Sequence, residues 1–147
     1  MLYRKLKCQP KRIVFTDGED SRVLRVAERM VAMGIGVPIL LGDKDKIHQL
    51  AKDESVCMEF VSVINPAKAS DLELFCHRLK KTTRYQGKEI LNPKEIMSRP
   101  HNFGAMMVQY SHADGMIAGN LSMPASVFRS VITIMKPLAE VPRIYGA

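Results

Sequence analysis

Strand-like and helix-like segments alternate along the first 64 residues, and this alternation constrains the fold more than any other feature. Short apolar runs typical of buried strands occupy residues 12–15, 37–41 and 58–64. Between them lie two segments whose apolar residues recur three and four positions apart, as on one face of a helix. Parallel strands need crossover connections of this length, and such crossovers are right-handed. The sequence therefore predicts a parallel sheet with crossover helices.

Capping and turn residues set the limits of these two helices. Asp20 or Ser21 is predicted to cap the first helix, because short polar side chains accept hydrogen bonds from the free amides of a first turn. Gly34 and Gly36 are expected to end that helix. The second helix is predicted over about residues 44–52.

The middle of the chain is predicted to be helical, over residues 71–84, 93–97 and 103–110. Pro100 is expected to end the second of these helices, and Asn102 to cap the third. The last residues, 143–147, have the apolar pattern that begins a further strand.

The stretch from residue 113 to residue 135 predicts a ligand-binding corner. Residues 114–119 form a short apolar run that ends in Gly119, and a helical period begins at Met123. Arg129 lies on this predicted helix. Where the carboxyl end of a strand meets the start of a helix, open α/β sheets bind ligands, often phosphates.

The charge of the chain favours a small anionic ligand over nucleic acid. The net charge is +7, but lysine and arginine are spread along the sequence, without a zinc-finger spacing or an aromatic-rich RNA-binding pattern. A phosphate ester would use the same charge with fewer basic residues. No run of about 18 apolar residues is present, so we expect no membrane span and no membrane partner.

Cysteine and histidine residues predict neither a disulfide framework nor a metal site. The cysteines are three and scattered, which suits reduced thiols in the cytoplasm: Cys8, Cys57 and Cys76. The four histidines lack metal-ligand spacing among themselves or with the cysteines: His48, His77, His101 and His112.

Ordered sequence blocks run nearly from one end of the chain to the other, at residues 12–20, 38–42, 65–66, 102–108, 113–119, 128–129 and 132–136. They begin with RIVFTDGED and include PILLG, NP, NFGAMMV, ADGMIAG, FR and ITIMK. In these blocks the chain resembles the phosphate acetyltransferase/phosphate butyryltransferase family, which includes the acyltransferase-like C-terminal domain of some malic enzymes.

The resemblance implies a three-layer αβα fold with a mainly parallel sheet, similar to isocitrate and isopropylmalate dehydrogenases. It implies transfer of an acyl group between coenzyme A and phosphate, in which the coenzyme A thiolate attacks the carbonyl of an acyl phosphate. Acetyl-CoA and acetyl phosphate would be ligands, with coenzyme A as a substrate and no separate cofactor.

The resemblance also implies that the chain is truncated. Family members are about twice as long, and their catalytic serine, aspartate and arginine lie near the far C-terminal end. We therefore expect residues 1–147 to be a single α/β domain, the N-terminal part of a larger acyltransferase. No catalytic residue is expected in this chain, and little activity from it alone.

Substrate binding is assigned by the resemblance to a few residues of this chain. Arg129 matches a family arginine that binds coenzyme A or phosphate, although a solvated arginine or an ion pair with Asp114 or Glu140 would also explain it. Arg84 is a second candidate, near the family glycine matched by Gly87. An ungapped match, however, puts Arg84 one residue beyond the family arginine.

The turn after the predicted fourth strand completes the candidate site, with Gly119, Asn120 and Ser122 as the residues that would bind phosphate or coenzyme A. A structural turn is the alternative. Three acidic residues after the first strand resemble a paired-carboxylate site: Asp17, Glu19 and Asp20. Helix capping and the positive end of the helix dipole explain these three without catalysis, and the sequence favours that interpretation.

Two other functions remain open at this point. The first is a non-catalytic module that binds coenzyme A or phosphate, or that assembles with a partner. The second is a dehydrogenase relative, which is disfavoured because no Gly-x-Gly-x-x-Gly fingerprint follows the first strand. A truncated domain also leaves apolar surface exposed, so we expect a homo-oligomer.

Overall fold

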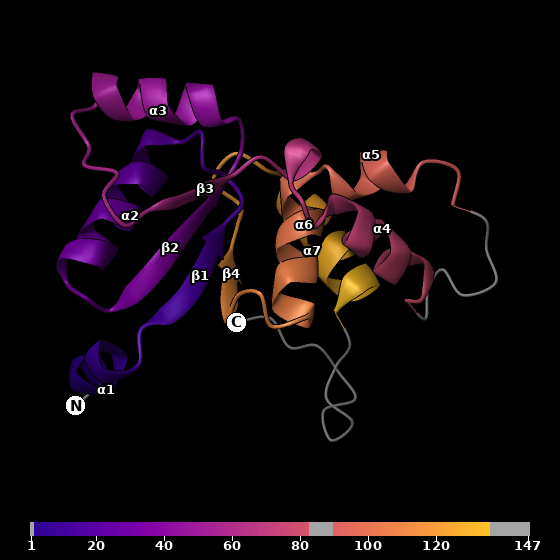
Figure 1. Cartoon of the computed structure of the whole chain (residues 1–147), viewed down its shortest axis with the longest axis horizontal. Helices are drawn as coiled ribbons and strands as arrows, with labels where there is room; N and C mark the ends of the chain where they lie inside the picture. Colours follow the sequence, from indigo (N-terminus) through magenta and orange to yellow (C-terminus); the bar gives the residue numbers. More distant parts are fainter. Residues whose placement is uncertain (1, 83–89, 136–147) are drawn as a thin grey trace.

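Four parallel strands form one sheet in the computed structural model of the chain, which describes residues 2–82 and 90–135 (Figure 1). They lie in the order β3-β2-β1-β4 and comprise β1 (Lys11–Phe15), β2 (Gly36–Leu41), β3 (Ser62–Ile64) and β4 (Gly115–Ile117). Each neighbouring pair is parallel. The parallel sheet predicted from the alternating segments is therefore confirmed.

Helices cover both faces of this sheet (Figure 1). One face carries α2 (Ser21–Ala32) and α3 (Lys44–Asp53), and the other carries α4 (Leu72–Lys80), α5 (Pro93–Met97), α6 (Pro100–Gln109) and α7 (Pro124–Ile134). Two short helices complete the described chain, α1 (Leu2–Cys8), which the sequence analysis did not anticipate, and the 3-10 helix η1 (Pro66–Lys68). The predicted three-layer αβα architecture is confirmed.

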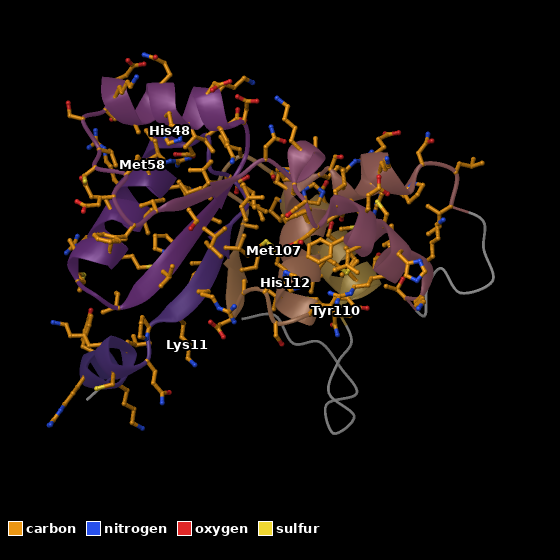
Figure 2. All side chains as sticks on the ribbon, in the orientation of Figure 1. Lys11, His48, Met58, Met107, Tyr110 and His112 are labelled. Carbon is orange, nitrogen blue, oxygen red and sulfur yellow. The ribbon has the colours of Figure 1, made fainter. Side chains whose placement is uncertain are left out.

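Successive residues of the strands enter opposite cores, because side chains alternate across a sheet. Val14 packs with α4 to α7, while the next residue, Phe15, packs with α2 and α3. In β2, Ile39 and Leu41 join the first cluster and Leu40 the second. Met107, labelled between the sheet and α6 in Figure 2, belongs to the first cluster.

Two predicted strands are shorter than expected. The third strand was predicted from residue 58, but β3 begins only at Ser62. Phe60 has a φ of 61°, a left-handed conformation that an extended strand cannot include. The fourth, predicted over residues 114–119, is confined to Gly115–Ile117, since Gly119 has a φ of 106° and turns the chain.

The start of α6 was predicted wrongly. Pro100 does not end a helix but begins α6, with Arg99 as the N-cap residue. Proline suits this first position because its missing amide has no helical partner there. Asn102 lies inside the first turn and does not cap it. Its amide nitrogen Nδ2 instead donates to the carbonyl oxygen of Ile96 at 2.7 Å, which joins α5 to α6.

Other boundaries follow the predictions more closely. Asp20 caps α2 as expected, because its carboxylate accepts a hydrogen bond from the Arg22 amide at 2.8 Å. Helix α4 ends at Lys80, four residues earlier than predicted. The expected strand at residues 143–147 and the expected helix end at Gly87 lie outside the described residues.

The lengths of the described helices and the state of the cysteines are as follows. None of the helices in the described ranges is both long enough and apolar enough to cross a bilayer. All three cysteines are free thiols, with Cys76 buried and Cys8 and Cys57 exposed.

Gly18 permits a close approach between the ends of β1 and β2. Its amide donates to the carbonyl oxygen of Leu41 at 3.2 Å. A Cβ atom at residue 18 would lie 2.7 Å from that same oxygen, and the oxygen belongs to the backbone of a central strand. The contact therefore requires glycine.

We expect Gly18→Ala to lower the free energy of unfolding by about 1–3 kcal/mol, because the added methyl group forces the backbone of β1 away from β2. Urea unfolding followed by circular dichroism measures this change. Gly115→Ala is the matched control, since its Cβ would meet only the flexible Ile13 Cδ1 atom, at 3.3 Å. Equal losses in the two variants would contradict the role of Gly18.

Candidate functional site

The order in which strands are added to the sheet reverses between β1 and β4. From β1 the chain adds β2 and β3 on one side, and β4 then pairs on the other side. In open α/β sheets, ligands bind in the crevice outside the carboxyl ends of the two strands where the order reverses. Here that position is formed by Thr16 to Gly18 after β1 and by Ala118 to Ser122 after β4.

Asp17 joins these two segments. One oxygen of its carboxylate, Oδ2, accepts hydrogen bonds from the backbone amides of Gly119 and Asn120, at 2.9 and 3.0 Å. The other, Oδ1, accepts one from the Ser122 hydroxyl at 3.0 Å. Asp17 is only 7% exposed, so the carboxylate depends on these donors to replace water. We call this arrangement the Asp17 clamp.

The Asp17 clamp brings together the three residues predicted for the turn, Gly119, Asn120 and Ser122. It also occupies the donors that an anion would use. A phosphate could take these amides only by displacing a buried carboxylate of the same charge sign. The Asp17 carboxylate therefore holds the turn at the carboxyl ends of the strands. The role of the turn in substrate binding stays a prediction.

A second carboxylate fixes the opposite ends of the same two strands. Asp114 accepts a hydrogen bond from the Arg12 amide at 2.8 Å, and its own amide donates to the Arg12 carbonyl oxygen at the same distance. The hydrogen bond from the Arg12 amide to the carboxylate, together with the Arg12 guanidinium, holds the pKa of Asp114 below its usual value. The alternative in which Asp114 pairs with Arg129 is therefore wrong. Glu140 lies outside the described residues.

A hollow of about 350 Å³ lies between α6 and α7. We call it the α6–α7 hollow. Its polar lining is mostly cationic or hydroxyl-bearing, and consists of Arg99, His101, Asn102, Ser126, Arg129, Ser130 and Thr133. Leu79, Ile96 and Ile134 form the apolar part. Among the residues that the structure describes, no acidic side chain belongs to this lining.

Arg129 contributes the cation of α7 to this hollow. The residue is exposed, and no hydrogen-bond or ion-pair partner occurs for it in the described ranges. Its position opposite the first turn of α6 follows from the packing of α7 against α6. Arg84, the other predicted arginine, lies outside the described residues.

Arg99, the N-cap residue of α6, adds a second guanidinium to the hollow, and His101 in the first turn adds an imidazole. Burial and the nearby Arg99 charge lower the pKa of His101, and the Asp17 carboxylate opposes this change. Asp17 therefore acts electrostatically on a residue of the hollow. The Arg99 guanidinium also lies 3.4 Å from Glu95 Oε1, in an exposed pair that solvent weakens.

Arg99 and His101 were not predicted as members of a site. The sequence raised His101 only as a metal-ligand candidate, and Pro100 was predicted to end a helix. The useful signal was the Arg-Pro-His order itself, since a proline at the first helical position puts both neighbours at a helix amino end.

The remaining acidic residues of the first block have structural roles, as the sequence favoured. Asp20 caps α2, and the Arg22 hydrogen bond holds the pKa of Asp20 below its usual value. Glu19 accepts a hydrogen bond from the Asp43 amide at 3.0 Å. In the described part of the chain, no three His, Cys, Asp or Glu side chains are grouped as metal ligands.

Another hollow, of about 390 Å³, lies at the carboxyl ends of β2 and β3. Two of its polar residues already serve the backbone: Asp43 caps α3, and Asn65 caps η1. Lysines and carboxylates alternate around its rim, with Lys44, Lys68, Asp45 and Asp71. This mixed rim favours neither an anion nor a cation, so the α6–α7 hollow is the better candidate.

Comparison with known proteins places the chain in one family. Residues 1–144 match the family model described as phosphate acetyl/butaryl transferase. A phosphate acetyltransferase from Staphylococcus aureus (strain MRSA252) is 34% identical over 151 residues, which cover 99% of this chain and 44% of the relative. A phosphate acetyltransferase from Helicobacter pylori (strain J99) is 31% identical, and the match covers 92% of this chain and 26% of the relative.

Solved structures agree with the sequence relatives. The EutD phosphotransacetylase from Staphylococcus aureus superposes with a TM-score of 0.87 at 29% identity, over 97% of this chain and 43% of that one. A phosphotransacetylase from Streptococcus pyogenes gives a TM-score of 0.88 at 26% identity, with the same coverage. The chain thus spans less than half the length of these relatives.

We expect Asp17→Ala to release the turn after β4, because three hydrogen bonds to a carboxylate are lost and each such bond contributes about 1.5–3 kcal/mol. Amide hydrogen exchange at Gly119 and Asn120 should accelerate at least about tenfold. Asp17→Asn should have a smaller effect, since its carbonyl oxygen still accepts from the backbone.

Asp53→Ala, on the distant helix α3, is the matched control and should leave exchange at these two amides unchanged. Unaltered exchange in Asp17→Ala would show that the turn holds its shape without the clamp.

Proposed function

The chain belongs to the phosphate acetyl/butaryl transferase family, and we propose that it forms the coenzyme A- and phosphate-binding part of a phosphate acyltransferase. The proposed reaction converts acetyl-CoA and phosphate into acetyl phosphate and coenzyme A. The observation that carries the proposal is the family match over residues 1–144, in a chain whose α6–α7 hollow is lined by cations.

The chemistry of the hollow fits a phosphate-bearing substrate. Guanidinium groups bind phosphate through two parallel N–H···O bonds, and such charge-assisted bonds are stronger than neutral ones. Arg129 has no partner among the described residues that it would lose on binding phosphate. Arg99 would lose only its exposed ion pair with Glu95. Ser126 and Thr133 add hydroxyl groups at the same wall.

The proposed reaction needs groups beyond those of the hollow. In the direction of acetyl-CoA formation, the coenzyme A thiolate attacks the carbonyl carbon of acetyl phosphate, a C–S bond forms, and phosphate leaves with the C–O electron pair. A base must first take the thiol proton. We propose no catalytic group in this chain and infer that the base belongs to the part of the relatives that this chain does not span.

We also propose that the chain works in an oligomer, in the cytoplasm. Support for association comes from large apolar side chains exposed in or near β4 and α7, namely Ile117, Leu121, Met123, Phe128 and Ile132. Three free thiols support a reducing compartment. A non-catalytic module that binds coenzyme A or phosphate is the alternative.

We expect Arg129→Ala to weaken coenzyme A binding about tenfold, as measured by isothermal titration calorimetry. This is the lower end of the range for a charge-assisted bond, because Arg129 is exposed and solvent screens its charge. Arg25→Ala is the matched control, since Arg25 pairs with Glu54 on the other face of the sheet. Equal affinity in wild type and Arg129→Ala would exclude Arg129 from the site.

We expect little or no formation of acetyl-CoA from acetyl phosphate by the 147-residue chain, because no catalytic group is proposed in it. A coupled assay with coenzyme A and acetyl phosphate measures this turnover. Coenzyme A binding without turnover is the expected result. Robust turnover would show that the chain contains its own catalytic groups.

A further inference from the structure

The α6–α7 hollow contains one group that can change its charge near neutral pH, the imidazole of His101. We propose that His101 takes up a proton when a phosphate-like anion enters the hollow, so that anion binding is linked to pH. This inference deepens the proposed function and rests on the same site. It concerns a residue for which the family resemblance implied no role.

Within residues 2–82 and 90–135, the charged groups around His101 come from three parts of the fold. Arg99 precedes it at the start of α6, Arg129 faces the same hollow from α7, and Asp17 acts on it from the end of β1. Glu95 reaches this set only through its exposed pair with Arg99. The parts of α4 and α5 that line the hollow, Leu79 and Ile96, are uncharged.

In the unliganded protein these surroundings favour the neutral imidazole. His101 is half-buried, so its charged form loses hydration, and Arg99 adds repulsion. The opposing Asp17 carboxylate is less effective, and its oxygens already accept three hydrogen bonds. The pKa of His101 is therefore held below its usual value, and the side chain is neutral at pH 7.

An anion in the hollow reverses this balance. A negative charge within about 4–6 Å favours the protonated form of an imidazole and offsets the repulsion from Arg99. The ligand is then held by two guanidinium groups and one imidazolium. The first turn of α6 has no side-chain cap, so its free amides also favour a negative charge at this wall.

The pH dependence has a definite sign. Below the unliganded pKa of His101, the imidazole is charged with or without the anion, and affinity is independent of its titration. Between the unliganded and the liganded pKa, each rise of one pH unit weakens binding by up to about tenfold, because one proton is taken up per anion. Above the liganded pKa, the weaker affinity is constant.

Sulfate is the first probe, because it keeps its double charge across this pH range whereas phosphate does not. Nuclear magnetic resonance of labelled imidazoles should give a higher pKa for His101 in sulfate than in chloride of equal ionic strength. His48 is the internal control. It is exposed on α3, which Figure 2 shows on the other side of the sheet from α6. An identical pKa of His101 in the two salts would overturn the proposal.

Coenzyme A is the second probe, titrated by calorimetry in buffers of different ionisation enthalpy. Wild type should take up more protons on binding than His101→Gln, and the difference removes the titration of the coenzyme's own phosphates. His101→Gln should lose affinity at low pH and match wild type at high pH. His48→Gln should behave as wild type. Parallel pH curves for wild type and His101→Gln would overturn the proposal.

The two probes separate this inference from the proposed function. If sulfate raises the pKa of His101 but coenzyme A does not bind, the proton linkage stands and the proposed substrate is wrong. If coenzyme A binds and Arg129→Ala weakens it while the pKa of His101 stays unchanged, the proposed function stands and the proton linkage is wrong. If neither probe binds, both are wrong.

Discussion

The corner between the carboxyl ends of β1 and β4 depends on the hydrogen bonds that the Asp17 carboxylate accepts. Strand β4 pairs with β1 over only three residues, too few to fix β4 and the turn that follows it. The Asp17 clamp secures the carboxyl ends, and the bonds between Asp114 and Arg12 secure the amino ends. Since α7 begins two residues after Ser122, the clamp also sets where that helix starts and hence where Arg129 lies.

The turn after β4 and Arg129 were both predicted to bind substrate, but they lie in different surroundings. The Gly119 and Asn120 amides bond to Asp17 and hold the protein together, whereas Arg99 and Arg129 line the hollow between α6 and α7. This separation suits the proposal that the domain presents phosphate-binding groups on a fixed frame. It also keeps a buried carboxylate close enough to influence His101 while its oxygens remain satisfied.

Much of the fold was predictable because its determinants are local. Apolar spacing identified the central strands and helices. Asp20 indicated the start of α2, because its carboxylate accepts a hydrogen bond from the amide of Arg22, only two residues further along the chain. The Asp17 clamp was not predictable, since it joins residues more than 100 positions apart. The start of α6 was missed because proline both ends and begins helices, and only packing decides which. Arg84, one of the predicted substrate ligands, lies outside the described residues.

The distance along the chain between Asp17 and Gly119 has a consequence for how the protein folds. Strands β1, β2 and β3 follow one another within 64 residues, so their pairing closes short loops. Pairing of β1 with β4 must enclose about a hundred residues, and contacts of such high sequence separation form slowly. We expect the nascent polypeptide to acquire its first three strands early and to complete the corner formed by β1, β4 and the Asp17 clamp last.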